Sequence, residues 1–252
     1  MEINKPGSVC VQFSGGSDST LSAYRMSLEF DQIHLLTFKQ KGQMNIENSR
    51  KSFAVLNEKF PGKFVHTMID VNDMFVQIYN RHYFRNLLKY GTLQLQFQCF
   101  ACQACFHINT IIYCLKNDIH DVRDGANTEY EEASPMQIEI VKKEIKKLYA
   151  EYGITHDSPV YHEYENDRSD HQLYRLGLRS QPNIKDDPEM YKEYQGYCRY
   201  MPSGVIFLNY WRTRKDFPQK VQILMREHWL EEVDFFKCLI NERRNQEFQL
   251  IT

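Results

Sequence analysis

A short glycine-bearing stretch constrains the fold of this chain more than any other feature. Residues 9–24 have the sequence VCVQFSGGSDSTLSAY. Ser8–Phe13 has the length and apolar character of a strand, whereas Thr20–Leu28 is rich in helix-forming residues. The small residues between them predict a tight strand-to-helix turn, in which Ser17 or Asp18 would cap the helix if the turn had no further role.

Strand-like and helix-like segments alternate through the first 153 residues. Further strand-like runs lie at Gln32–Phe38, Lys63–Asp70 and Asp121–Gly125, and helix-like stretches at Asn45–Phe60, Asn72–Lys89, Ala101–Lys116 and Ser134–Gly153. This alternation predicts an α/β fold, a Rossmann-like doubly wound parallel sheet.

The last hundred residues have a different character. His156–Pro188 is polar and punctuated, which predicts loops and short helices, and Phe217–Arg244 has a helical pattern. We therefore expect a sheet domain over residues 1–153 and a mostly helical extension over residues 154–252, packed on the same core.

The composition is typical of a soluble globular protein, with 42% hydrophobic and 25% charged residues. No apolar run is long enough to span a membrane and no signal segment precedes the first strand, so a cytoplasmic location is expected. The net charge of −2 argues against an extended nucleic-acid footprint. The basic runs Lys142–Lys147 and Arg212–Lys215 are therefore interpreted as solvated faces.

The glycine-bearing turn has the composition of a phosphate site. It follows the first strand at the carboxyl edge of the predicted sheet, where α/β proteins bind ligands. The amides at the start of a helix attract anions, and Gly15 and Gly16 let the backbone approach a phosphate closely. Hydroxyl donors are supplied by Ser14, Ser17, Ser19 and Thr20. Asp18 suits such a site if Mg²⁺ lies between its carboxylate and the phosphates.

The segment SGGSDST, Ser14–Thr20, resembles the SGGxDS loop of the PP-loop, or N-type, ATP pyrophosphatase superfamily, which has an adenine nucleotide alpha-hydrolase-like fold. The resemblance implies that the loop binds the pyrophosphate part of ATP while the α-phosphate is transferred as AMP. It places Asp18 and Ser19 in the catalytic centre. It also implies that Thr37 and Phe38, at the end of the second strand, lie beside the adenosine.

A second segment supports the same resemblance. DGANTEYEEAS, residues 124–134, is similar to the Gly-x-Asn turn that follows the fourth strand in this superfamily, with Gly125, Asn127 and Glu129 in the matching positions. The frequent Asp-Asp pair is replaced by Glu129–Tyr130, which leaves the catalytic role of this turn open. The alternative is a plain strand-to-helix turn with an acidic helix start.

Three of the seven cysteines lie in CFACQACFH, residues 99–107. Cys-x-x-Cys-x-x-Cys spacing suits zinc or an iron–sulfur cluster. On a helix, however, Cys99, Cys102 and Cys105 would spread over about 120° of the surface, which is too wide for all three to bind one group. We therefore expect two ligands from this motif and one from elsewhere, with Cys198 as the candidate. The remaining cysteines, Cys10, Cys114 and Cys238, suit small buried positions.

The cysteine layout resembles the sulfur-inserting branch of the superfamily, which includes the tRNA 2-thiocytidine and 2-thiouridine synthetases. Carried over by position, Cys102, Cys105 and Cys198 would hold a 4Fe-4S cluster with one free iron. Cys99 has no place in that pattern and could replace a ligand, act as a fourth, or carry sulfur. The 7-cyano-7-deazaguanine synthase branch, which holds a structural zinc with four cysteines, is the second choice.

The expected function is ATP-dependent adenylation of an acceptor oxygen with release of pyrophosphate, followed by thiolation. Two alternatives stay open: a PP-loop ligase that uses ammonia or an amine and a cysteine-bound zinc, and a regulatory module that binds adenine nucleotides without turnover. The acceptor is a small molecule or an RNA base. A sulfur-donor protein and a second copy of the chain are further candidate partners. Arg168, Arg175 and Arg179 could reach a phosphate, but solvated loop charges are favoured.

Overall fold

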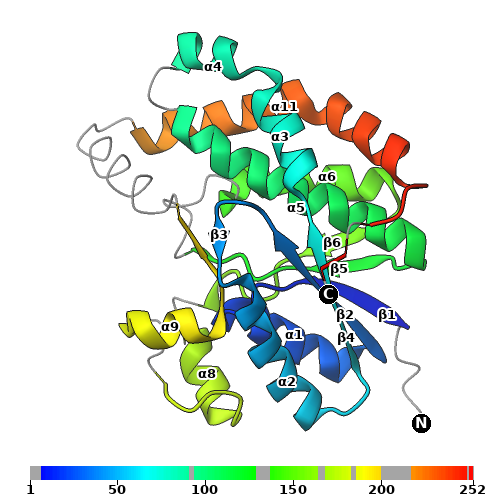
Figure 1. Cartoon of the computed structure of the whole chain (residues 1–252), viewed down its shortest axis with the longest axis vertical. Helices are drawn as coiled ribbons and strands as arrows, with labels where there is room; N and C mark the ends of the chain where they lie inside the picture. The colour runs from blue at the N-terminus through cyan, green and yellow to red at the C-terminus, as the bar shows by residue number, and fades with distance from the viewer. Residues whose placement is uncertain are drawn as a thin grey trace.

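A computed structural model describes residues 7–90, 94–128, 137–163, 168–182, 186–199, 217–248 and 250–251. Its centre is a parallel sheet of five strands in the order β4-β2-β1-β5-β6 (Figure 1). The strands are β1 Ser8–Gln12, β2 Gln32–Lys39, β4 Phe64–Asp70, β5 Asp121–Arg123 and β6 Thr155–Asp157. The predicted α/β class and the parallel strand direction are therefore confirmed.

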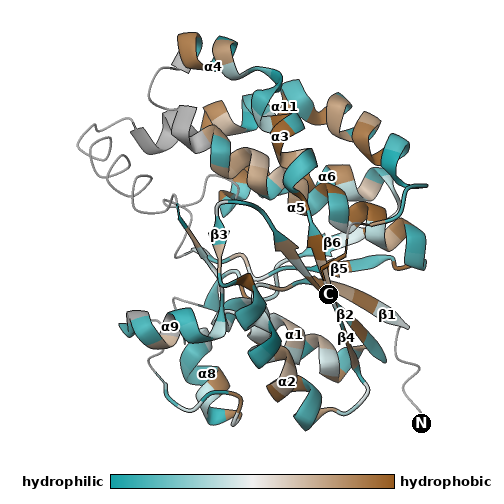
Figure 2. Cartoon of the chain, viewed as in Figure 1, coloured by the Kyte–Doolittle hydropathy of each residue, from teal (hydrophilic) through white to brown (hydrophobic). Residues whose placement is uncertain are grey.

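Helices cover both faces of this sheet (Figure 1). One face carries α1 Ser17–Glu29, α2 Ser49–Lys59 and α8 Ser169–Arg175, and the other α3 Asn72–Arg81, α5 Gln94–Asn117, α6 Glu139–Glu151 and α11 Phe217–Arg243. Two hydrophobic clusters fill the two interfaces. Figure 2 shows hydrophobic colours on β1 and β2, which agrees with strands buried on both faces.

Two smaller units lie near the carboxyl edge of the sheet. Strand β3, Gln43–Met44, pairs with β7, Tyr197–Cys198, in an antiparallel ribbon. The 3₁₀ turn Ile46–Asn48 and helix α9, Pro188–Tyr194, flank this ribbon. The C-terminal extension thus reaches back to the edge of the sheet at which ligands bind in α/β proteins.

Several predicted boundaries differ from the structure. The helix expected over Asn72–Lys89 is divided at His82 into α3 and α4 Tyr83–Tyr90, because His82 leaves helical geometry at ψ 26° and φ −128°. The helix expected from Ala101 begins at Gln94 and so contains Cys99.

The fifth strand of the sheet lies beyond the boundary expected at residue 153. Strand β6 pairs with β5 over three residues within the stretch predicted as loops. Three residues are too few to show a period of two in the sequence, so this strand gave no signal. The basic run at residues 212–215 lies outside the described residues. Among the helices that are described, none combines the length and apolar character needed to cross a membrane.

Candidate functional site

The glycine-bearing loop joins β1 to α1 at the carboxyl edge of the sheet. Gly15 has a φ of +83°, in the left-handed region that glycine tolerates best. A Cβ at this position would lie 2.6 Å from the Cα of Ser49 and 2.6 Å from the carbonyl oxygen of Tyr194. Both conformation and space therefore require glycine here.

The first turn of α1 starts without a side-chain cap. Gly16 is the N-cap residue, so the alternative of a plain turn capped by Ser17 or Asp18 does not describe this helix start. The Gly16 amide donates to Ser14 Oγ at 3.2 Å, and Ser19 Oγ donates to the Gly16 carbonyl oxygen at 3.2 Å. Because no described side chain caps the amides of the first turn, these N–H groups can donate to an anion.

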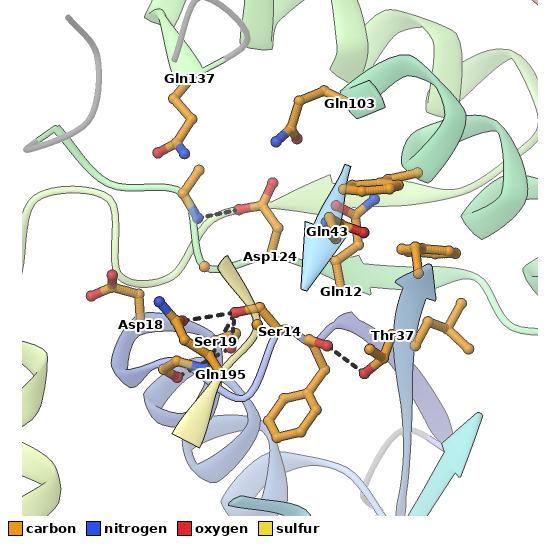
Figure 3. A pocket seen from close by; sticks show the side chains of 18 of the residues that line it. Gln12, Ser14, Asp18, Ser19, Thr37, Gln43, Gln103, Asp124, Gln137 and Gln195 are labelled. Atoms are coloured by element: carbon orange, nitrogen blue, oxygen red, sulfur yellow. Dashed lines mark hydrogen bonds between the residues drawn. The ribbon is translucent and has the colours of Figure 1, made fainter. Parts of the chain in front are cut away.

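A cavity of about 390 Å³ opens in front of this loop. Figure 3 shows the loop on one side of it and the turn after β5 on another. The predicted site residues in its wall are Ser14, Gly16, Ser17, Asp18, Ser19, Thr37, Phe38, Gly125 and Cys198. The structure thus brings together residues from β1, β2, β5 and β7.

Two predicted residues lie behind the loop instead of in the cavity wall. Gly15 directs its carbonyl oxygen away from the cavity, and Thr20 Oγ1 donates to that oxygen at 3.3 Å. Both residues shape the loop, and Thr20 is fully buried.

The end of β2 forms another wall. The Thr37 hydroxyl donates to the Phe13 carbonyl oxygen at 2.5 Å and lies 2.8 Å from His66 Nε2, so it is engaged within the protein. The Phe38 ring stacks on Phe106 with 5.0 Å between centroids and 13° between planes. This pair gives the cavity a flat apolar surface.

The turn after β5 packs directly on α1. A Cβ on Gly125 would lie 2.6 Å from the Ser19 amide nitrogen, so only glycine permits this approach. Asn127 is buried, and its side-chain amide atoms have no hydrogen-bond partner among the described residues. Glu129, the third predicted residue of this turn, lies outside the described residues.

A buried carboxylate that the sequence analysis did not select holds this turn. One oxygen of Asp124 lies 3.0 Å from His156 Nε2, and the other accepts from the Ala126 amide at 3.0 Å. Burial raises the pKa of Asp124, but the hydrogen bond and charge of His156 and the charge of Lys142 outweigh burial and hold this pKa well below its usual range. Asp124 is therefore an anion in the cavity wall.

His107 connects helix α5 to the strand that carries the loop. Its Nδ1 lies 3.1 Å from Gln12 Nε2 and 3.1 Å from the Tyr149 hydroxyl. Burial lowers the pKa of His107 to about 3, with a further contribution from His156, so the ring is neutral at pH 7. The sequence assigns no role to His107 or His156, because their partners are distant in the chain.

Lys142 corrects the interpretation of the run Lys142–Lys147 as a solvated face. Lys143, Lys146 and Lys147 are exposed as expected, but Lys142 is only 7% exposed and lines the cavity. Its Nζ lies 3.2 Å from the centroid of the Tyr161 ring. The helical period of α6 is the signal that separates Lys142 from its neighbours, because it shares a face with buried Ile138 and Ile145.

The three cysteines of α5 differ in burial. Cys105 is fully buried in the core cluster of α3, α5, α6 and α11, whereas Cys99 and Cys102 are half-buried, with Cys102 packed against that cluster. Burial raises the pKa of Cys99 to about 11, with a contribution from Cys198. Burial also raises the pKa of Cys102, and Cys105, Cys99 and Cys198 add to the effect. Cys99, Cys102 and Cys198 therefore lie in one neighbourhood, which Cys105 adjoins through Cys102, and Cys198 lines the cavity.

These thiols do not form a compact chelate. Within the ranges that the structure describes, no three His, Cys, Asp or Glu side chains are placed to hold a metal ion. The three remaining cysteines, Cys10, Cys114 and Cys238, follow their expected role only in part: Cys10 and Cys114 are buried, and Cys238 is exposed on α11.

Comparison with known proteins gave structural neighbours only. No protein-family model and no curated protein matches the chain. Among solved structures, a predicted subunit of a tRNA methyltransferase from Methanocaldococcus jannaschii shares 21% identity at a TM-score of 0.39, with 62% of this chain and 69% of that chain covered. The U34-tRNA thiolase NcsA from Methanococcus maripaludis, solved with its 4Fe-4S cluster, shares 12% identity at a TM-score of 0.40, with 94% of this chain and 72% of that chain covered.

The described fold agrees with the resemblance found in the sequence. A parallel α/β sheet carries the SGGSDST loop between β1 and α1, and Gly125 of the turn after β5 packs on that helix. The chain thus resembles the PP-loop ATP pyrophosphatases in the position of both segments as well as in their residues.

Proposed function

We propose that this protein binds ATP at the Ser14–Thr20 loop, transfers AMP to an acceptor oxygen with release of pyrophosphate, and then exchanges that oxygen for sulfur. The observation that carries the proposal is the uncapped start of α1 behind a loop that only glycine can form. Such a helix start, open to a cavity and adjacent to a carboxylate at Asp18, suits a phosphate chain with Mg²⁺.

The proposal implies one orientation of ATP in the cavity. Its β- and γ-phosphates lie on the amides of the first turn of α1 and on the hydroxyls of Ser14, Ser17 and Ser19. Asp18 is the residue that would hold Mg²⁺, which neutralises phosphate charge. The adenosine lies toward β2, where the stacked rings of Phe38 and Phe106 offer a flat apolar surface.

The reaction consists of two displacements without net oxidation. The acceptor oxygen attacks the α-phosphorus, the bond from that phosphorus to the bridging oxygen breaks, and pyrophosphate leaves. A sulfide anion then attacks the activated carbon and AMP leaves with the former acceptor oxygen. The protein contributes position and charge: the loop donors and Lys142 face the phosphate region, where negative charge develops.

Neutral polar side chains line the part of the cavity away from the loop. Figure 3 shows Gln103 and Gln137 directed into it from the side opposite Ser14. An amide group both donates and accepts hydrogen bonds, so these residues suit the neighbouring N–H and C=O groups of an RNA base or a small heterocycle. The acceptor is proposed to be of this kind.

The sulfur-handling site is proposed at Cys99, Cys102 and Cys198. Cys105 is omitted from it because its side chain lies in the hydrophobic core, away from the cavity. These three thiols lie near one another, and thiolates are the ligands that hold a 4Fe-4S cluster. A cluster held by these three residues would supply an iron that could bind sulfide. The thiols would lose their protons on binding it.

The test measures the products of ATP turnover by anaerobically prepared protein with sulfide and candidate acceptors. Pyrophosphate and AMP in equal amounts are expected, together with a thiolated acceptor. Asp18→Asn should lower pyrophosphate formation by about 10²- to 10³-fold, as expected for loss of transition-state charge stabilisation. Asp73→Asn, in the first turn of α3 and outside the cavity wall, is the matched control and should leave the rate unchanged.

Other outcomes identify the alternatives. Pyrophosphate release that requires ammonia or an amine instead of sulfide would support the ligase. Tight binding of AMP or ATP with no turnover for any acceptor would support the regulatory module. Release of ADP and phosphate would contradict the assignment of the loop to the pyrophosphate part of ATP.

A further inference from the structure

We propose that Arg179 is a positioning residue of the phosphate loop: its buried guanidinium fixes the Gly15–Gly16 peptide from behind, and the bound phosphates supply the negative charge that it lacks. This inference rests on the proposed function, because it requires phosphates on the loop. Arg179 comes from the C-terminal extension, more than 150 positions from the loop that it contacts.

The contacts of Arg179 converge on one carbonyl group. Its Nη2 atom donates to the Gly15 carbonyl oxygen at 2.8 Å, to Ser52 Oγ at 2.9 Å and to Thr20 Oγ1 at 3.2 Å. Ser52 Oγ in turn donates to the same Gly15 oxygen at 2.6 Å. Three side chains from three different segments therefore hold a single backbone oxygen.

Fixing this oxygen fixes the amide that faces the phosphates. In a trans peptide the N–H of residue 16 points opposite to the C=O of residue 15. The Gly15 oxygen points toward buried Arg179, so the Gly16 amide points toward the cavity side, where it meets Ser14 Oγ. At Gly15 the backbone would otherwise be free to rotate, because glycine has no Cβ to restrict it.

The charge of Arg179 is not balanced by any described carboxylate. The side chain is 5% exposed, its Nε has no hydrogen-bond partner among the described residues, and no ion pair of Arg179 occurs there. The guanidinium stacks on the Tyr194 ring at 4.3 Å. Burial lowers the pKa of Arg179 to about 10, so it stays charged at neutral pH.

Burying a charge without an ion-pair partner lowers the stability of the folded protein, unless a nearby group of opposite charge compensates it. A phosphate chain bound on the other side of the loop would supply negative charge close to Arg179. The polarised Gly15–Gly16 peptide lies between the two charges, with its oxygen toward Arg179 and its N–H toward the cavity. Arg168 makes the contrast clear, since it pairs with Asp170 at 2.9 Å and with Asp186 at 3.1 Å.

The experiment compares binding of magnesium pyrophosphate with binding of adenosine, by calorimetry, in Arg179→Met and Arg179→Lys. Loss of a charged hydrogen bond predicts that Arg179→Met binds pyrophosphate about 10- to 100-fold more weakly. Adenosine binding should change less than about twofold, because its surface lies at β2. Arg179→Lys should recover part of the loss, since lysine keeps the charge without the planar fork.

The matched control is Arg168→Met, which removes an arginine of the same extension and should leave pyrophosphate binding unchanged. A variant at Arg179 that weakens both ligands equally, or neither, would overturn the proposal. If Arg179→Met fails to fold, Arg179→Lys and Ser52→Ala carry the test, because each removes part of the contact to the Gly15 oxygen. A wild-type protein that binds neither pyrophosphate nor ATP would instead contradict the proposed function itself.

Discussion

The phosphate loop and the cysteine neighbourhood are built in opposite ways. The loop is one continuous segment, and its shape is fixed by backbone conformation and by hydrogen bonds from Ser52 and Arg179 to Gly15. The cysteine neighbourhood combines two turns of α5 with β7, about a hundred residues away, and burial keeps Cys99 and Cys102 protonated. The loop thus has its shape in the isolated chain, whereas the proposed cluster would have to draw the thiols together.

This difference shows which kinds of site can be predicted from a sequence. A backbone-built site requires particular residues at consecutive positions, and glycine at a left-handed position leaves no substitute. A site built from side chains on separate elements depends on which helix face each residue occupies. The predictions that follow test each kind of site by the change that should damage it and leave the other intact.

Gly15→Ala should have the largest effect. The substitution places a Cβ in a left-handed conformation and 2.6 Å from two backbone atoms, so the loop cannot keep its shape. Binding of ATP, measured by calorimetry, should be lost while the iron content of anaerobic protein is kept. Gly62→Ala is the matched control, since Gly62 has a φ of +74° with nothing within 4 Å, and it should cost only about 1–2 kcal/mol of unfolding free energy.

The cysteine neighbourhood is tested by four single substitutions to serine. Cys99→Ser, Cys102→Ser and Cys198→Ser should each remove bound iron and visible absorbance while leaving ATP binding unchanged. Cys105→Ser should keep the iron and instead lower the unfolding free energy by about 1–3 kcal/mol, because it buries a hydroxyl in the core. Loss of iron from the Cys102, Cys105 and Cys198 variants, with iron kept in Cys99→Ser, would instead support the ligand set that the sequence resemblance implied.

Sequence reasoning found the loop because its chemistry is local. The strand, the two glycines, the hydroxyls and Asp18 are consecutive, and the structure places them at the carboxyl edge of a parallel sheet as expected. The same reasoning expected two ligands from the Cys99–Cys105 run, which stays a prediction. It could not tell which two, because that depends on the face of α5 that packs against α11 and α6.

Residues that act through distant partners escaped the sequence analysis. Asp124 and His156 form a pair only after β5 and β6 align, and β6 is too short to be recognised. Arg179 was interpreted as a solvated loop charge, because no residue near it in the sequence indicates that it contacts the Gly15 carbonyl oxygen. Lys142 was hidden in a run of lysines whose other members are solvated. In each case the missing information is tertiary packing, which local patterns do not carry.

Lys142→Met tests the buried lysine in the cavity wall. Loss of one charged contact predicts a decrease in the rate of pyrophosphate release of about 10- to 100-fold, with ATP binding less affected. Lys146→Met is the control on the same helix, because Lys146 is exposed and pairs with Asp157 at 2.7 Å. Equal effects of the two substitutions would return Lys142 to the role of an ordinary surface charge.

The smallest expected effect concerns His107. This residue connects α5, which carries Cys99 and Cys102, to Gln12 in the strand before the phosphate loop. The pKa of His107 is about 3 in the folded protein because of burial, against about 6.5 in an unfolded chain. Below about pH 6.5 the unfolded state therefore binds a proton at His107 that the folded state does not bind. As the pH falls further, this residue lowers the unfolding free energy by about 1.4 kcal/mol per pH unit. His66, whose pKa burial lowers to about 4, adds a similar slope. Urea unfolding between pH 7 and pH 5 should show a shallower decline in His107→Gln than in wild type, because glutamine cannot take up the proton. Equal slopes would mean that folding does not lower the pKa of His107.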